Sequence, residues 1–123
     1  MNDSNLVEQV TESIYAADPS LLEKYGEQGK EKCRQDNRHH LDHLRTAHEL
    51  QDDRVFADYA IWLDGILRSH GMTTQLLIDN FILLQQALTE CRGLTEDELK
   101  AYDAYLAKGI AVLRQSSAKE GSK

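Results

Sequence analysis

Apolar residues recur every three or four positions along most of this chain, and this helical spacing is the feature that most restricts its fold. The alternation of apolar and polar residues that marks a half-buried strand does not occur. A single proline, Pro19, interrupts the runs, and glycines stand singly between them, as in helices joined by short turns. We therefore predict an all-α fold, a compact bundle of about five helices.

The turn signals divide the chain into helical segments. A first helix is predicted to end before Pro19, a short helical turn follows over 19–25, and Gly26 and Gly29 are predicted to form a loop. A threonine followed three residues later by a glutamate, Thr95 and Glu98, predicts a capping box at the start of the last helix. The main helices are predicted over about 4–17, 30–50, 53–70, 74–92 and 96–115. They form one domain over 1–117, with a disordered tail over 118–123.

The charge and length of the chain restrict its partners. A chain of 123 residues is enough for one core, and 14 basic against 21 acidic residues give a net charge of −7. Such a chain repels phosphate groups, so we expect neither a nucleic acid nor a membrane as a partner. The polar start also lacks the basic and apolar regions of a secretory signal, and we expect a cytoplasmic protein with reduced cysteines.

The stretch QDNRHHLDHLRTAHEL places four histidines within ten residues: His39, His40, His43 and His48. On a helix, residues three, four or seven apart share a face. Cys33, Asp36, His40 and His43 then form one row, which is a candidate metal site if another helix supplies a further ligand. A second alternative is a tetrapyrrole held by His40 as an axial ligand. The ordinary interpretation is a solvated helix flank with one hydrogen-bonded histidine in the core.

Asn37 and His40 stand on the stripe of their helix where apolar residues belong. A buried polar group needs a partner, which here could be a backbone carbonyl or a tyrosine hydroxyl. The functional interpretation is a polar point in an apolar pocket, built to orient a ligand. On that interpretation the candidate ligand-binding residues are Asn37, His40, Tyr59 and Trp62, although core packing also explains the aromatic side chains.

The run LLIDNFILL, residues 76–84, is apolar on nearly all sides of a helix. We predict that a second copy of the chain covers part of it, giving a homodimer with Leu77, Phe81 and Leu84 as candidate interface residues. Asp79 and Asn80 interrupt the run, and we interpret them as the edge of that interface or as a polar contact with a partner helix.

A set of residues within about 23–90 carries a resemblance to a known kind of helical domain: Tyr25, Gly26, Gly29, Cys33, Asp36, His40, Leu41, Leu44, Phe56, Tyr59, Trp62, Leu63 and Leu67. On these residues, this part of the chain resembles the helical segments that precede cobalamin-binding or other output domains in bacterial regulatory proteins. The resemblance implies an all-helical sensory or regulatory domain. The Asp-x-His-x-x-Gly loop of a cobalamin-binding domain is missing, because no such glycine follows Asp42 and His43, so cobalamin binding by this chain is not implied.

No nucleophile stands in a recognisable catalytic context, and no glycine-rich phosphate loop is present, so we do not expect an enzyme. The predicted function is that of a non-enzymatic regulatory or sensory protein, which acts through protein partners or a small bound apolar ligand. The alternative is a metal- or tetrapyrrole-binding helical protein that uses the histidine-rich helix.

Overall fold

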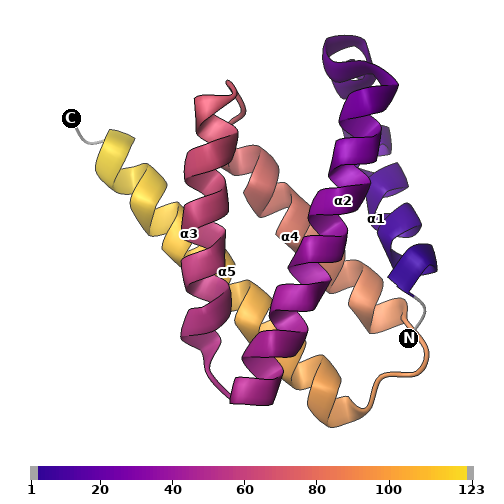
Figure 1. Cartoon of the computed structure of the whole chain (residues 1–123), viewed down its shortest axis with the longest axis vertical. Coiled ribbons are helices and arrows are strands. Elements are labelled where there is room, and N and C mark those ends of the chain that lie inside the picture. Colours follow the sequence, from indigo (N-terminus) through magenta and orange to yellow (C-terminus); the bar gives the residue numbers. More distant parts are fainter. Residues whose placement is uncertain (1–2, 122–123) are drawn as a thin grey trace.

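The computed structural model describes residues 3–121 and shows an all-α bundle, with no strand in that range (Figure 1). This confirms the predicted fold class. No helix of the described part is long and apolar enough to cross a membrane. The five helices are α1 (Asp3–Ala17), α2 (Ser20–Leu50), α3 (Asp53–Ser69), α4 (Thr74–Glu90) and α5 (Glu96–Gly121).

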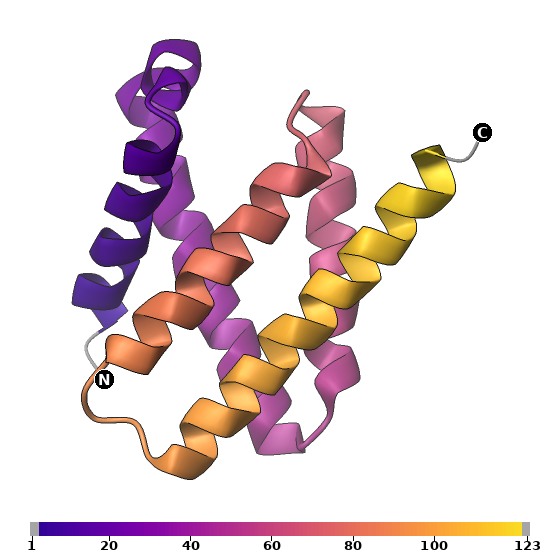
Figure 2. The same ribbon diagram turned by 180° about the vertical axis from the view of Figure 1, so that it is seen from behind.

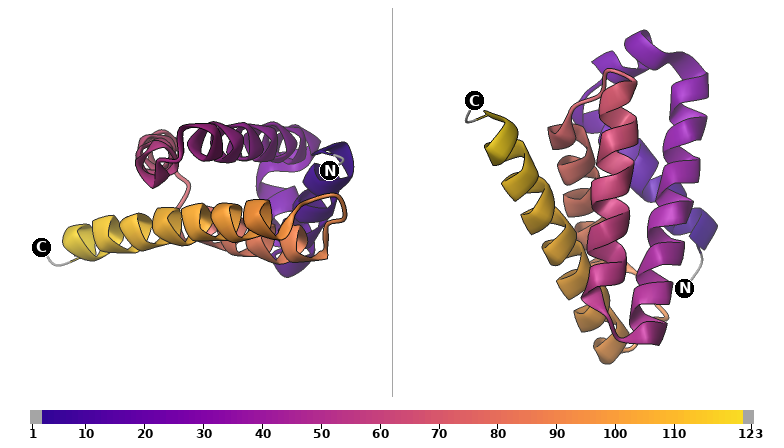
Figure 3. Two further views of the ribbon diagram at one scale, coloured as in Figure 1. Left: turned by 90° about the horizontal axis from the view of Figure 1, so that it is seen from below. Right: turned by 60° about the vertical axis from the view of Figure 1, so that its left-hand side comes forward.

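The helices form two layers. The hairpin of α2 and α3 makes one layer and the hairpin of α4 and α5 makes the other, while α1 packs against α2 and α4 at one edge (Figures 2 and 3). Seen from below in Figure 3, the C-terminal end of α5 extends past the other helices. Helix α1 therefore covers the edge of the bundle that α2 and α4 form. At the other edge, the two layers are held together by the packing of α3 against α5.

Two phenylalanines mark the centre of the core. Phe56 of α3 and Phe81 of α4 are fully buried, and their ring centroids lie 5.1 Å apart. Gly109 of α5 lets that helix approach them closely, because a Cβ at this position would come within 2.9 Å of the Phe56 ring. The close packing here leaves no room for a side chain on α5.

The three residues predicted to form a dimer interface lie in this core. Leu77 is 2% exposed, and Phe81 and Leu84 are fully buried. These three side chains are covered by other helices of the same chain, so this placement of the interface is wrong. Three further apolar residues of the same run, Leu76, Ile82 and Leu83, are only partly buried. The homodimer itself stays a prediction, and its surface must lie elsewhere.

Capping groups fix the helix ends that the sequence indicates. Asp52 accepts a hydrogen bond from the backbone N–H of Arg54 at the start of α3. At α5 the predicted capping box is confirmed, since Thr95 and Glu98 each accept a bond from the other's backbone N–H at 3.1 Å.

Two boundaries differ from the prediction. The predicted loop at Gly26 and Gly29 is only a kink, because α2 runs from Ser20 to Leu50 with non-helical angles at Gly26 alone (φ 66°, ψ −167°). Helix α5 continues to Gly121, so the backbone of 118–121 is helical where a disordered tail was expected. Residues 122–123 of that tail lie outside the described part.

The kink provides a test of the local backbone. Gly26→Ala places a Cβ in a conformation that is essentially restricted to glycine, so we expect the free energy of unfolding to fall by about 1–3 kcal/mol. Gln28→Ala, at an exposed position two residues further along α2, should change it by less than about 0.5 kcal/mol. Urea denaturation followed by circular dichroism measures both. Equal effects of the two substitutions would contradict the role of the kink.

Candidate ligand-binding site

Four buried polar side chains from three helices meet inside the bundle. Asn37 and His40 come from α2, Tyr59 from α3 and Asn80 from α4, and none is more than 8% exposed. Their helices bring them together because each stands on the inward face of an amphipathic segment. Buried polar groups of this kind must satisfy one another, and these do.

His40 is held by hydrogen bonds at both ring nitrogens. Its Nε2 lies 3.2 Å from Asn80 Oδ1, which can only accept, so Nε2 carries the proton and donates. The other nitrogen, Nδ1, then accepts from the Tyr59 hydroxyl at 2.6 Å. This neutral tautomer joins α2 to both α3 and α4, and the predicted bond of a core histidine to a tyrosine hydroxyl is confirmed.

The two asparagines complete the network. Asn80 Nδ2 donates to Asn37 Oδ1 at 2.7 Å, and Asn37 Nδ2 donates back to Asn80 Oδ1 at 3.3 Å. The same Asn37 amide also donates to the backbone carbonyl of Cys33 at 2.9 Å. Asn80 thus contacts α2 of its own chain, and its interpretation as the edge of a dimer interface is wrong.

Burial keeps these groups uncharged. Loss of water lowers the pKa of His40 from 6.5 to about 3, so the ring is neutral at pH 7. Burial also raises the pKa of Tyr59, with Asp36 and Asp42 adding to the effect, and it raises the pKa of the Cys33 thiol to about 11. A thiol with so high a pKa is a poor nucleophile at neutral pH.

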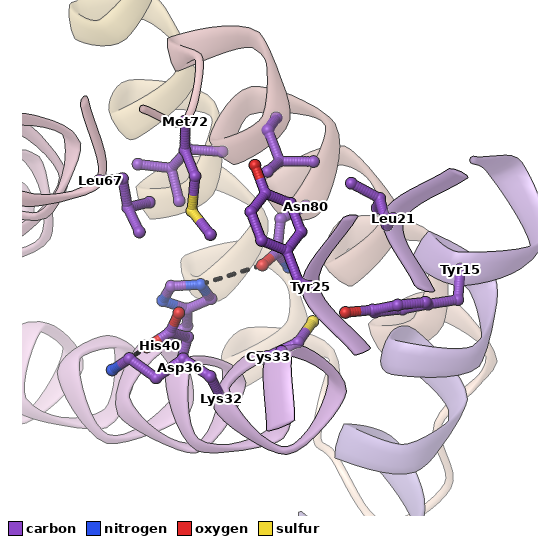
Figure 4. Close-up of a pocket in the computed structure, with 13 residues that line it drawn as sticks. Tyr15, Leu21, Tyr25, Lys32, Cys33, Asp36, His40, Leu67, Met72 and Asn80 are labelled. Carbon is purple, nitrogen blue, oxygen red and sulfur yellow. Dashed lines mark hydrogen bonds and ion pairs between the residues drawn. The ribbon is translucent and has the colours of Figure 1, made fainter. Parts of the chain in front are cut away.

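A cavity of about 80 Å³ opens directly above this network (Figure 4). Its floor includes the hydrogen-bonded His40 and Asn80, and the Lys32–Asp36 ion pair (3.1 Å) lies beside it, with the Lys32 side chain 59% exposed. The rest of the lining is mainly apolar or aromatic and comes from α1, α2, α4, the end of α3 and the loop that joins α3 to α4. These residues are Tyr15, Leu21, Tyr25, Gly29, Cys33, Leu67, Met72, Leu76 and Leu77.

Glycines shape one end of the cavity. The kink at Gly26 turns the chain just after Tyr25, and Gly29 lets the Tyr25 side chain lie against the next turn. A Cβ at Gly29 would come within 2.3 Å of Tyr25 Cβ, a distance that real structures do not tolerate. Figure 4 shows Tyr15 on the same side, with its hydroxyl toward Cys33. Both glycines are therefore part of the site's construction.

A second and larger hollow, a groove of about 270 Å³, lies between α2 and α3, on the other side of Lys32 and Asp36. There the His43 ring stacks on Tyr59 with a centroid distance of 3.7 Å. Trp62 lines this groove rather than the cavity, and it is 62% exposed. The structure thus joins three of the four predicted ligand-binding residues, Asn37, His40 and Tyr59, in the buried network and places Trp62 on the outer surface. Of the four, only His40 lines the cavity, while Tyr59 and Trp62 line the groove.

The metal alternative finds no support in this geometry. Among the side chains described, those of residues 3–117, no three His, Cys, Asp or Glu side chains converge in a way that could hold a metal ion. In the predicted row, Asp36 pairs with Lys32, and His43 donates from Nδ1 to the carbonyl of His39 at 2.8 Å. Because both nitrogens of His40 are engaged, its use as an axial ligand to a tetrapyrrole would break the buried network.

Sequence reasoning missed several residues of the cavity. Tyr15, Tyr25 and Met72 line it although they lie far from the histidine-rich stretch. One signal was available for Asn80, since a polar residue within an apolar run on one helix suggests a partner such as Asn37 on another.

Comparisons with models of known protein families, with curated proteins and with solved structures give no match for this chain.

The buried network predicts unequal effects of the histidines on stability. His40→Ala leaves a hole and removes partners from Tyr59 and Asn80, so the free energy of unfolding should fall by about 2–4 kcal/mol. His39→Ala, on the exposed side of the same helix, should change it by no more than about 0.5 kcal/mol. Urea unfolding at pH 7.5 compares the two. Similar losses for both variants would be incompatible with the network.

The lowered pKa of His40 predicts a loss of stability in mild acid. The folded pKa of about 3 lies below the unfolded value near 6.5. Stability is therefore fully present above pH ~6.5 and is lost as the pH falls toward the folded pKa, because only the unfolded chain takes up the proton. Between about pH 7 and 5 this one group should remove about 2 kcal/mol.

His40→Gln isolates this contribution. The variant should lose about 2 kcal/mol less than the wild type over that range, whereas His39→Ala should lose as much as the wild type. Urea unfolding at a series of pH values gives the comparison. An unchanged pH dependence in His40→Gln would mean that His40 is not buried as a neutral ring.

Proposed function

We propose that this protein is a non-enzymatic helical regulatory protein that binds a small, largely apolar molecule in the cavity above His40 and Asn80. The observation that carries the proposal is the cavity itself, which has apolar walls and a floor of buried, hydrogen-bonded polar groups. Apolar surface that supplies affinity and a few polar atoms that supply orientation are the chemistry of small-molecule sites, which commonly measure about 300–1,000 Å³. A volume of about 80 Å³ restricts this cavity to a very small ligand or to one end of a larger ligand that extends through its opening. The proposal also agrees with the sensory role that the sequence resemblance implies.

The lining indicates the chemistry of the ligand. Apart from the Lys32–Asp36 pair the cavity offers no charged side chain, so an ionised group inside it would lack a free counter-charge. The Asn80 carbonyl oxygen already accepts two hydrogen bonds, from His40 and Asn37. A neutral ligand with one polar group, such as a hydroxyl that meets Tyr15, Tyr25 or the rim, fits these constraints best.

The position of the cavity suggests how binding is relayed. Its walls come from α1, α2 and α4 and from Leu67 near the end of α3, so a ligand contacts every helix except α5. Its floor is tied through His40 to Tyr59 in the middle of α3. A ligand that favours one arrangement of these helices shifts the population toward it, which is the basis of a regulatory response.

Small aromatic probes test the proposal. Toluene and p-cresol should cause saturable amide shifts in ¹H–¹⁵N spectra, confined to residues around the cavity, with p-cresol binding more tightly through its hydroxyl. Leu67→Trp should fill the space and abolish the shifts. Leu83→Trp changes a half-buried leucine of α4 that does not line the cavity, and binding should persist.

Two results would contradict the proposal. One is an absence of saturable shifts with either probe in the folded wild type. The other is binding that survives Leu67→Trp, because the ligand would then occupy a different place.

A further inference from the structure

The outward side of α3 carries an apolar surface that no other part of the described chain covers. Ile61 is 49% exposed, Trp62 62% and Ile66 37%, and all three belong to one helix of 17 residues. Gly65 lies between them and is itself exposed. We call the surface formed by Asp58, Ile61, Trp62, Gly65, Ile66 and Ser69 the outer face of α3.

Gly65 is the unusual residue of this face. Glycine in a helix interior is less stable than alanine by about 1 kcal/mol and normally answers a local need. The described part of the chain shows no such need, because the backbone there is helical and a Cβ at Gly65 would meet nothing within 4 Å. Gly109, by contrast, is required by the Phe56 ring of the same chain. A glycine on the exposed surface of a helix allows the backbone of another helix to approach closely.

We propose that the outer face of α3 binds the same face of a second copy, with the two helices antiparallel about a two-fold axis. Four residues along the middle of the outer face of α3 follow the four-three-four spacing of a coiled-coil seam: Asp58, Trp62, Gly65 and Ser69. When two such helices pack antiparallel and centred on the middle of this seam, Trp62 lies over Gly65 of the second copy. Each copy supplies both a large side chain and the space to receive it, as an isologous interface requires.

Charge favours this partner and this direction. The acid of the seam, Asp58, lies on the N-terminal side of the apolar surface, and Arg68 lies on the C-terminal side. Parallel packing would place Asp58 directly against Asp58 of the second copy, where like charges repel. The antiparallel arrangement instead places Asp58 opposite Ser69 and near Arg68 of the second copy, whose guanidinium also pairs with Asp64 of its own chain at 3.1 Å, and it does so twice.

The assembly state and the single tryptophan report on this interface. Light scattering of the wild type at micromolar concentration should give twice the chain mass of 14.0 kDa. Trp62 emission should shift to the blue as the concentration rises, because the second copy removes the indole from water. The dimer is expected to form in the absence of any ligand, so a missing dimer and a failure of the cavity to bind its probes are separate, distinguishable results.

Gly65→Leu is the decisive variant. The new side chain points into open space in one copy, so the fold should be kept, but it fills the position that Trp62 of the second copy needs. The dissociation constant should rise by about 100-fold or more. Ala104→Leu adds a similar bulk at an exposed position of α5 and should leave the dimer intact.

Cysteine pairs test the direction of packing in a Cys33→Ser/Cys91→Ser background. The double variant Asp58→Cys/Ser69→Cys should form covalent dimers on mild oxidation, and Ser69→Cys alone should not. A wild type that stays monomeric, a dimer unaffected by Gly65→Leu, or efficient cross-linking of the single variant would each overturn the proposal.

Discussion

The buried contact between His40, Tyr59 and Asn80 is the constraint on which the rest of this bundle depends. Apolar packing alone would allow α2, α3 and α4 to slide or rotate by one residue at modest cost, since leucines and alanines pack in many ways. Hydrogen bonds inside a core have no such tolerance, because a shift of one residue would leave several polar groups without partners. The network therefore fixes the register of three helices, and α1 and α5 pack around the result.

The cavity follows from the same constraint. Once His40 and Asn80 are joined, the N-terminal halves of α2 and α4 must separate enough to hold the side chains above them. The kink at Gly26 and the absent Cβ at Gly29 then direct Tyr25 into that region without closing it. A polar network and two glycines thus leave an open space where continuous apolar packing would have filled it.

The sequence predicts those features of the structure that depend on interactions between residues close together in the chain, and it does not predict those that depend on contacts between distant segments. The helices, the capping box at Thr95 and a buried His40 were all readable, because each depends on residues close in the chain. Helical spacing could not show that other helices of the chain cover Leu77 and Phe81, nor which helix receives Asn80, since these are matters of tertiary packing. The cavity depends on side chains from four helices and was predicted only as a pocket near Asn37 and His40.

Helix α3 connects the inside of the bundle to its surface. Tyr59 bonds His40 within the network, and its ring centroid lies only 6.4 Å from that of Trp62 on the outer face. A ligand that moved His40 would move its hydrogen-bond partner Tyr59 and so shift α3. A second copy bound at Gly65 would restrict the position of the same helix. Under both proposals the two sites act on the same helix, so any effect of one on the affinity of the other must be reciprocal and of the same factor. Coupling between the cavity and the dimer therefore needs no further pathway through the bundle than α3 itself.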